Sequence, residues 1–528
     1  MISSGYPVPD TVAEPFMTTQ ILPLTAFGPL LLVAAALLTR VRPGPRLAET
    51  AALCALALSL AGAVQLMTGG AQALALSPGV RLTLDAIGVT MAVLVAFVGW
   101  IVLRYCRTYL HGEARAPRAQ AGILIVLAAV LVLVQAGDLA LMAVCTMVIG
   151  AAMRDLLLFY PDRPAARRAA AKFVRVWGAG DVALVLAAVM AWVAFGTTDL
   201  ATLKAAATGP LTPAAQGAVA ALVLTALLKS AAFPLHGWLT EVMEAPTPVS
   251  ALLHAGVINA GGLLLIRTAD LVQASPGAMA VLVTMGGLTA LFGAAVMLIQ
   301  SAVKTALAWS TVAQMGFMLM QCGLGLWSLA LLHIVAHGLY KAHGFLASGN
   351  AVAAVAAAGR PGPVAVPGIG AVAQAFALAL ALYATVALGF AAIGGQKSAQ
   401  ALALGAILIF GTAYLVAQGL ADAAPRALTR RTAMASVAAA LGYFGFHLLA
   451  GALWGPHLPL PPSPGALEWA LIALAVISFG MVAVAQALFP LWAHHPAMAG
   501  LRVHLANGLY LNALFDRLIG GFRAARSS

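Results

Sequence analysis

Residues 227–267 read LLKSAAFPLHGWLTEVMEAPTPVSALLHAGVINAGGLLLIR, and the rest of the chain is organised around them. Five titratable side chains lie within or beside strongly apolar sequence in this stretch: Lys229, His236, Glu241, Glu244 and His254. The stretch also contains prolines, which interrupt regular helix. A charge in apolar surroundings is costly unless it is paired, hydrated or neutralised. The stretch therefore predicts a functional site.

The composition predicts an all-α polytopic membrane protein. Of the 528 residues, 62% are hydrophobic and 8% are charged, whereas a soluble domain carries about 25% charged residues. Apolar segments of roughly 20 residues recur along the chain, which favours membrane helices over a barrel with strands of about 10 residues. The net charge of +12 comes from arginines in short loops and does not indicate nucleic-acid binding. The scattered cysteines predict neither a disulfide framework nor a zinc site.

About 15 membrane helices are predicted. They lie near 20–39, 47–67, 83–104, 119–136, 138–160, 172–196, 214–231, 247–268, 276–299, 302–321, 325–350, 366–391, 400–420, 433–453 and 466–490. Loops with several basic residues, such as that with Arg163, Arg167, Arg168 and Lys172, alternate with loops that hold few. Since Lys and Arg accumulate in cytoplasmic loops, the alternation predicts a multi-pass bacterial inner-membrane protein with a periplasmic N-terminus and a cytoplasmic C-terminus.

The tail at 491–528 differs from the membrane helices because charged and apolar residues are interleaved along it. This pattern predicts a short amphipathic helix at the cytoplasmic surface. A solvated tail is the alternative, and the apolar periodicity favours docking on the membrane surface or on a partner.

A second titratable cluster lies at 333–343, which reads HIVAHGLYKAH. His333, His337 and Lys341 are four residues apart, so they stack along one face of a helix. Histidine titrates near neutral pH, and desolvation can bring a lysine down towards it. Such a column suits proton relay, whereas the alternative is hydrogen bonding between helices. A metal site is disfavoured because no cysteine or carboxylate accompanies the histidines.

For the other charged residues in or near the predicted spans, the sequence gives a weaker indication of their role. Lys304 opens the preceding helix, where a relay role and snorkelling to the interface both remain open. Asp181 begins a long apolar run and needs a partner. Arg175 lies six residues earlier and is a poor helical neighbour, so a cation on another helix is the better candidate. Asp85 lies a few residues into its predicted span, and its environment is left open.

Three motifs carry a family resemblance. KSAAFPLHGWLTEVMEAPTPVSALLHAG closely resembles the signature of the large antiporter-like subunits of respiratory complex I and of Mrp-type cation/proton antiporters. VKTALAWSTVAQMGFM, followed by HIVAHGLYKAHGFLASG, is similar to the second signature of this superfamily, and KFVRVWGAGD resembles its sixth-helix motif. The resemblance covers about residues 80–350.

The resemblance implies two inverted five-helix repeats with broken helices, at about 119–268 and 276–420. They would follow N-terminal membrane helices at 1–118 and precede C-terminal membrane helices at 421–490 and the tail at 491–528. By position, it implies that Lys229 is the broken-helix lysine and Lys341 the central lysine. It also implies relay histidines and a sixth-helix polar pair: His254, His333 and His337, and Asp181 with Arg175.

Two departures from the superfamily pattern stand out. The fifth-helix glutamate that partners the first lysine has no counterpart before Asp155, so Lys229 needs another partner, and Asp181 is expected first. The second broken-helix lysine is missing from 366–391, although Lys397 lies just beyond. Together with the short tail, which leaves no room for a lateral helix, these changes argue against a working complex I subunit.

EVMEAPTPVSALLHAGVINAGG, RDLLLFYPDRPAARRAAAKF and VHLANGLYLNALFDRL are most similar to a smaller branch, the DabB membrane subunits of DAB-type inorganic-carbon complexes. This resemblance implies a large cytoplasmic DabA-like partner with a zinc site like that of β-carbonic anhydrases. It also implies no cofactor in this chain, which would be an ion-translocating subunit rather than an enzyme. The alternatives are a Na+/H+ antiporter subunit of an Mrp-like assembly and a complex I-like proton-pumping subunit.

The resulting hypothesis is cation flow, of protons or sodium ions, that makes CO2 hydration to bicarbonate by the partner effectively one-way. The expected relay comprises Lys229, His254, Lys304, His333, His337 and Lys341. The expected charge partners are Asp181, Arg175, Glu241, Glu244 and His236. The broken segment 232–246 is predicted to face the cytoplasm, where it would transmit changes in charge pairing to the partner.

Overall fold

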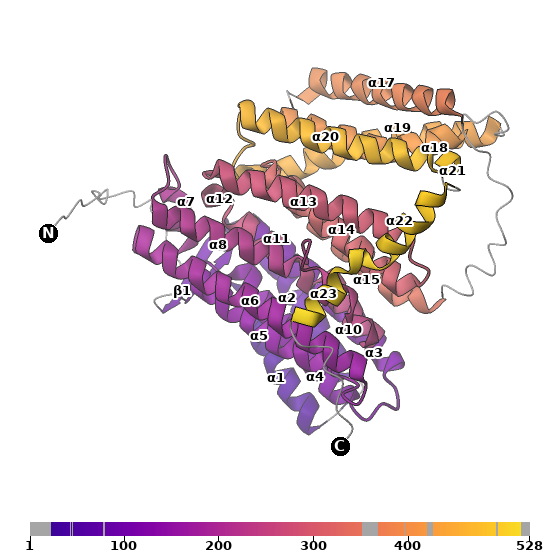
Figure 1. Cartoon of the computed structure of the whole chain (residues 1–528). Coiled ribbons are helices and arrows are strands. Elements are labelled where there is room, and N and C mark those ends of the chain that lie inside the picture. The colour runs from indigo at the N-terminus through magenta and orange to yellow at the C-terminus, as the bar shows by residue number, and fades with distance from the viewer. Residues whose placement is uncertain are drawn as a thin grey trace.

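A computed structural model describes residues 23–42, 44, 46–77, 80–350, 368–394, 397–419, 426–492 and 495–518. These residues are almost entirely helical, as the sequence predicts (Figure 1). The long helices are α1 (Phe27–Val41), α2 (Leu47–Gly69), α3 (Ala86–Tyr109), α4 (Ala116–Gln135), α5 (Leu139–Leu157), α6 (Pro164–Phe195), α8 (Pro213–Lys229), α13 (Pro276–Met297), α14 (Val303–Gly323), α15 (Trp327–Ala347), α17 (Ile369–Gly394), α18 (Ala399–Gly419), α19 (Arg426–Trp454) and α20 (Ala466–Ala487).

Shorter elements interrupt or connect the long helices. The α-helical ones are α7 (Leu200–Ala206), α9 (Gly237–Thr240), α10 (Thr247–Ala255), α11 (Ala260–Arg267), α12 (Ala269–Gln273), α21 (Phe489–Trp492), α22 (Pro496–Ala506) and α23 (Leu511–Leu518). The 3₁₀ turns are η1 (Leu24–Ala26), η2 (Val242–Glu244), η3 (Val257–Asn259), η4 (Ser348–Asn350), η5 (Gly455–His457) and η6 (Gly508–Tyr510).

A β-hairpin between α2 and α3 was not predicted from the sequence. Its strands β1 (Gln72–Ser77) and β2 (Val80–Leu84) pair antiparallel, with Gln72 opposite Leu84. The sequence did contain a signal, because VRLTL alternates with period two and follows a Pro-Gly dipeptide. The hairpin corrects the all-α expectation only locally, at one end of the bundle.

Every predicted span coincides with one of these helices, or with the pair α10 and α11 for 247–268. The predicted span 20–39 begins, and the predicted tail ends, in residues outside those described. Among the described residues, 11 helices are long and apolar enough to cross a membrane. The predicted number is not confirmed by this criterion, because four predicted spans fall short of it: α8, α14, α15 and α18. Of these, α8 stops at Lys229 after 17 residues. The two-repeat organisation stays a prediction.

The segment formed by α10 and α11 lies at the centre of the bundle. Its membrane window, Thr247–Arg267, is 94% buried, against 17–67% for the other candidate spans. It packs against α3, α8, α14 and α15. The apolar second half of residues 227–267 is therefore the most enclosed of the candidate spans, and His254, which it contains, lies in the interior of the bundle.

Close helix contacts depend on glycine where α13 crosses α14. A Cβ atom on Gly286 would lie 2.5 Å from the backbone nitrogen of Met320, and one on Gly316 would lie 2.4 Å from that of Ala290. Small residues let the helix backbones approach in this way, as is common between membrane helices. This seam packs α14 tightly against α13, and α14 separately contacts α11 of the central segment.

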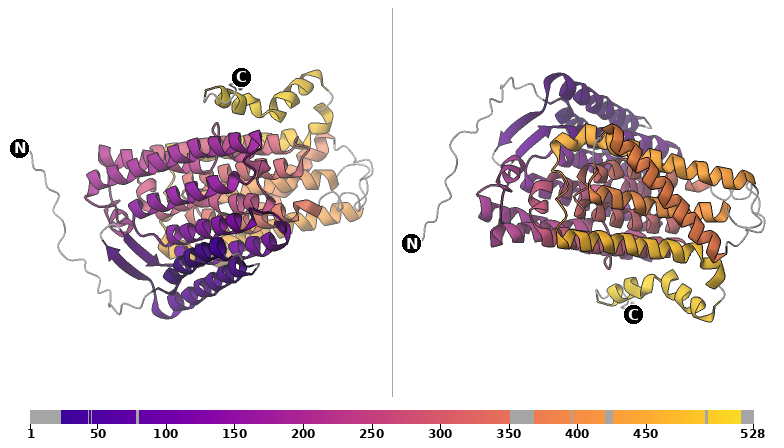
Figure 2. Two further views of the ribbon diagram at one scale, coloured as in Figure 1. Left: turned by 90° about the horizontal axis from the view of Figure 1, so that it is seen from below. Right: turned by 90° about the horizontal axis from the view of Figure 1, so that it is seen from above.

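The C-terminal helices form a separate layer. In Figures 1 and 2, α17–α20 lie on the far side of α13–α15 from α1–α6, and their own small buried cluster centres on Tyr383 and Phe444. After α21 the chain leaves this layer, and α22 and α23 form a strip outside the bundle (Figure 2). The strip returns to α6, so that the tail lies against the first half of the protein.

Candidate ion-translocation site

Helix α8 ends at Lys229, and two residues later Ala231 adopts the left-handed backbone conformation that commonly terminates helices. Ala231 has φ = 51°, and the backbone N–H of Ala232 donates to the carbonyl of Leu227 at 3.0 Å. This is the hydrogen-bond pattern of a Schellman-type helix end, although glycine is the usual residue at the left-handed position. Helix propagation resumes only at α9, so the predicted break directly after Lys229 is present.

Lys229 forms a buried ion pair at this break. Its side chain is fully buried, and Nζ lies 2.6 Å from Oδ1 of Asp181 on α6. The same ammonium lies 4.0 Å from the ring centroid of Trp177 and donates to the carbonyl of that residue at 3.4 Å. The expected contact between Lys229 and Asp181 is therefore present. Because the two charges balance, the pair can persist in apolar surroundings.

The other expected charge partners lie elsewhere. Arg175 is exposed and makes no ion pair with another described residue, because six helical residues turn its side chain well away from Asp181. Glu244 pairs with Arg163 at 3.1 Å at the surface. Neither Arg175 nor Glu244 contacts Lys229, and Asp181 pairs with a cation on another helix, as the six-residue spacing from Arg175 predicted.

Glu241 instead joins a charge triad that the sequence did not reveal. Lys172, only 1% exposed, lies 2.6 Å from Oε1 of Glu241 and 2.7 Å from Oδ1 of Asp516. Burial raises the pKa of the Glu241 carboxyl, and the neighbouring Lys172 does not fully offset this rise. The triad thus connects α6, the broken segment and the tail helix α23.

The tail makes two further contacts with the broken segment. Asn512 Nδ2 donates to Thr240 Oγ1 at 3.3 Å. A Cβ atom on Gly237 would lie 1.5 Å from Oδ1 of Asn512, so only glycine leaves room for this side chain. Gly237, Thr240 and Glu241 therefore form a docking surface for α23.

His236 lies between the buried pair and the triad along the broken segment. It is fully buried, and its ring lies 4.9 Å from that of Trp309, 5.4 Å from that of Phe292 and 6.1 Å from that of Phe233. Neither ring nitrogen has a protein hydrogen-bond partner. A neutral imidazole carries a proton on one nitrogen and can accept a second proton on the other, and no described protein group occupies either position of His236.

The second cluster spans α10, α14 and α15. His254 Nδ1 lies 3.1 Å from Thr311 Oγ1, and His337 Nε2 lies 3.2 Å from the backbone oxygen of His254. The rings of His333 and His337 are 6.0 Å apart. These three histidines are therefore brought together as expected.

Lys341 occupies the end of this histidine column. Its ammonium donates to the carbonyl of Leu307 at 2.9 Å and contacts the hydroxyl of Ser310. It forms no ion pair with another described residue. Lys341 is fully buried, and the described residues that its ammonium contacts are neutral, so none of them balances its charge.

Lys304 stands apart from both clusters. It is half-buried near the start of α14 and has no hydrogen bond or ion pair with another described residue. A relay role for Lys304 therefore stays a prediction without a contact to support it.

The gap between the two clusters contains buried polar atoms. Ser230 Oγ, Asn259 Oδ1 and His254 Nε2 are buried and have no protein hydrogen-bond partner. Ser230 follows Lys229 and approaches α11 so closely that a Cβ atom on Gly261 would lie 2.3 Å from its hydroxyl. Asn259 lies in η3, which interrupts the central span five residues after His254. Buried polar atoms without a protein partner thus accompany both clusters, at Ser230 beside Lys229 and at Asn259 and His254 in the central span.

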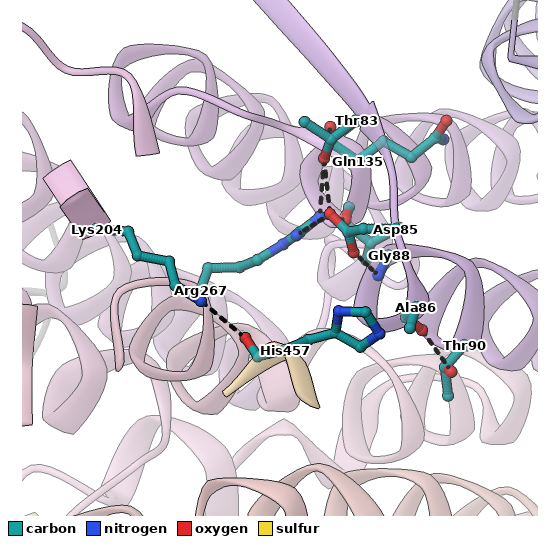
Figure 3. Close-up of polar contacts among 10 residues, drawn as sticks. Thr83, Asp85, Ala86, Gly88, Thr90, Gln135, Lys204, Arg267 and His457 are labelled. Carbon is teal, nitrogen blue, oxygen red and sulfur yellow. Dashed lines mark hydrogen bonds and ion pairs between the residues drawn. The ribbon is translucent and has the colours of Figure 1, made fainter. Parts of the chain in front are cut away.

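A separate polar network closes the end of the bundle near the hairpin (Figure 3). Arg267 Nη1 lies 2.5 Å from Asp85 Oδ2, and its Nη2 donates to Thr83 and to the carbonyl of Val134. Burial raises the pKa of the Asp85 carboxyl, but Arg267 and hydrogen bonds from Gly88 and Thr83 outweigh it and hold the pKa below its usual value. The network joins β2, α3, α4 and α11, which answers the open question about Asp85.

Comparisons with known proteins identify similar membrane subunits. Residues 136–358 match the family described as NADH:quinone oxidoreductase/Mrp antiporter, TM, and residues 72–118 match the N-terminus of chain 5 of NADH-ubiquinone oxidoreductase (complex I). The probable inorganic carbon transporter subunit DabB2 of Halothiobacillus neapolitanus is 34% identical over 446 residues, which cover 82% of this chain and 79% of the relative.

Two further similarities are informative. The probable inorganic carbon transporter subunit DabB of Hydrogenovibrio crunogenus is 40% identical over 49% of this chain and 51% of its own length, so this chain matches about half of that relative. A chain in the structure of the Mrp complex from Dietzia sp. DQ12-45-1b has a TM-score of 0.63 at 24% identity, over 95% of this chain and 60% of that chain. The second similarity concerns the fold alone.

Proposed function

Because this chain belongs to the family of antiporter-like membrane subunits that includes the DabB inorganic carbon transporter subunits, we propose that it conducts cations, protons in the first instance, across a bacterial inner membrane. The resemblance predicted from the motifs and the multi-pass membrane fold are both confirmed. The direction of flow, the partner and the coupled reaction are parts of the proposal.

The buried pair of Lys229 and Asp181 is the observation that carries the proposal. The two charges meet 2.6 Å apart at a helix break inside the bundle. A proton that reaches Asp181 neutralises the carboxylate and leaves the ammonium unpaired in apolar surroundings. Because an unpaired buried charge is strongly unfavourable, Lys229 must then release its own proton. Arrival of one proton thus drives departure of another.

The contacts suggest a route with two access points. On one side of Lys229, His254 contacts His337, from which the column along α15 extends to Lys341 in one direction and to His333 in the other. His333 and His337 also line a groove of about 570 Å³ between α14–α15 and α18–α19, which gives this column an opening. On the other side, His236 and Glu241 follow Lys229 along the broken segment, and Glu241 pairs with Lys172.

The energy available for coupling is modest but useful. One proton that moves down about 100 mV releases roughly 2.3 kcal/mol, or some 50-fold in an equilibrium constant. That is enough to make a reversible reaction in a partner effectively one-way.

We propose that the partner is a large cytoplasmic DabA-like zinc protein that hydrates CO2 to bicarbonate. The relatives' names support this assignment, since they are inorganic carbon transporter subunits. The structure offers a surface for the coupling: the broken segment, Lys172 and the tail helix α23 share one charge triad. A change of charge at Lys229 would reach that triad through His236.

The proposal can be tested by growth in air of a bacterial host that cannot grow there without an inorganic-carbon uptake system. Lys229→Ala and Lys341→Ala variants that still insert and bind the partner are expected to fail to rescue growth in air, whereas Lys204→Ala, whose ammonium lies 3.7 Å from Asp270 away from both clusters, is expected to rescue it. Full rescue by either of the first two variants would contradict the relay.

A Na+/H+ antiporter subunit of an Mrp-like assembly is the second candidate, favoured by the fold similarity to an Mrp complex chain. Co-purification separates the two. Several small membrane partners would favour the antiporter, whereas one large zinc-containing protein would favour the carbon pump.

A further inference from the structure

A groove of about 580 Å³ opens at the arginine-rich end of the bundle, away from both titratable clusters. It lies between the start of α4, the end of α5 and the last turn of α1. Four arginines and a single carboxylate line it: Arg40, Arg115, Arg118, Arg154 and Asp155. The groove therefore carries an excess of positive charge.

The single carboxylate does not satisfy these arginines. Asp155 is shared between Arg118 and Arg154 at 3.4 Å each, and those two side chains remain 68% and 55% exposed. Arg40 makes no ion pair with another described residue. Since a guanidinium has five N–H donors, most of the donors in the groove are free to bind an anion.

Arg115 is held in place by the protein itself. Its guanidinium donates to the carbonyls of Leu158 and Phe159, at 3.5 and 3.3 Å. These contacts fix the loop after α5 against the start of α4 and shape one end of the groove. The arginines are thus arranged around a formed hollow and are not scattered on a flat surface.

The remaining wall of the groove is apolar and extends along the two membrane helices. Gly122 and Ile125 of α4 face Val148, Ala151 and Ala152 of α5 across it. These residues form an apolar slot in which Ala151 and Ala152 carry small side chains, while the side chain of Leu156 fills the space beside Gly122. The slot begins at the arginines and continues towards the membrane interior.

We propose that this groove binds an anionic phospholipid, with the phosphate at the arginines and an acyl chain in the slot between α4 and α5. The combination of a cationic end and an apolar slot fits one amphipathic anion better than a free phosphate, which would leave the slot unfilled. Basic hollows between membrane helices on the cytoplasmic side are suited to such head groups. The proposal does not depend on the ion-conduction mechanism.

Lipid retention during purification tests the site. The full chain, solubilised and incubated with equal amounts of phosphatidylglycerol and phosphatidylcholine, is examined by native mass spectrometry. The wild-type chain is expected to retain phosphatidylglycerol, and Arg118→Gln with Arg154→Gln is expected to lower retention by about tenfold or more. Arg430→Gln with Arg431→Gln, two exposed arginines of α19, serves as the matched control and is expected to leave retention unchanged.

A second variant tests the slot without changing the charge. Ala151→Trp places a bulky side chain at an exposed wall position and is expected to lower lipid retention while folding is unaffected. Equal loss in the α19 control, no preference for phosphatidylglycerol, or displacement of the lipid by millimolar inorganic phosphate would each overturn the proposal. The last result would indicate a free-anion site.

Discussion

Lys229 and Asp181 illustrate how a single residue pair defines this site. The lysine was predicted to need a partner because the fifth-helix glutamate of the superfamily has no counterpart, and Asp181 lies 2.6 Å from its ammonium. The pair joins residues that are 48 positions apart in the sequence. Their apolar surroundings indicated that each needed a partner, whereas only the packing of α6 against α8 could bring them together.

Removing one member of this pair is expected to cost both stability and function. Asp181→Asn leaves the lysine charge buried without a partner, which typically costs about 3–5 kcal/mol. Thermal unfolding in detergent should therefore show a lower Tm. The double variant Lys229→Gln with Asp181→Asn has no unpaired charge and should recover most of the Tm, yet it should still fail to support growth. An Asp181→Asn variant as stable and active as the wild type would contradict this account of the pair.

Asp85 gives the network near the hairpin a defined pH dependence. Its pKa lies below the usual value because Arg267 and several hydrogen bonds outweigh its burial. The ionised form therefore contributes stability above the ordinary carboxyl pKa of about 4, and this contribution is lost as pH falls through the lower folded-state pKa. The Tm difference between wild type and Asp85→Asn should be constant above about pH 5 and shrink on acidification. If this Tm difference grew on acidification instead, the pKa of Asp85 would be raised by folding, which would contradict the account of the network.

At the scale of elements, the start of α6 was not predicted correctly. The predicted span began at 172, which put Lys172 in a loop, whereas α6 begins at Pro164. The arginines of its first two turns resemble a loop in composition, because composition does not reveal a helix that extends beyond the apolar region. The extension places Lys172 where Glu241 and Asp516 can reach it.

The central span shows a second limit of sequence reasoning. Its apolar pattern predicted one continuous helix at 247–268, but the chain passes through η3 between α10 and α11. Gly256, with φ = −116° and ψ = −76°, departs from helical geometry there. No proline marks this interruption, so its position depends on tertiary packing. By contrast, the break after Lys229 was predicted from Pro234 and is present.

The docked tail is expected to depend on Asp516. Asp516→Asn removes one of the two carboxylates that Lys172 contacts, at 2.7 Å, and should loosen α23 from the broken segment. Hydrogen–deuterium exchange of residues 511–518 should then become faster, while exchange in α13 and α14 is unchanged. Arg517→Gln alters the neighbouring residue, which belongs to no ion pair with a described residue, and should leave exchange as it is. Unchanged exchange in Asp516→Asn would show that the triad does not hold the tail.

At the scale of the whole molecule, both polar clusters adjoin the most enclosed segment: α11 packs against α8, which carries Lys229, and α10 carries His254 of the second cluster. The Lys229 pair belongs to α6 and α8, and the Lys341 column belongs to α10, α14 and α15, with Ser230 and Asn259 between them. Sequence motifs identified most of the residues of both clusters. They could not identify which neighbours satisfy each charge, because those neighbours come from distant helices.

The most direct test of cation conduction is a flux measurement on the purified chain, together with its co-purified partner, in proteoliposomes. A potassium diffusion potential drives uptake, and an internal pH dye reports proton entry. The wild type is expected to show potential-dependent acidification that Lys229→Ala and Lys341→Ala abolish and Lys204→Ala retains. Undiminished acidification in the Lys229→Ala vesicles would contradict the claim that the Lys229–Asp181 pair carries the translocated charge.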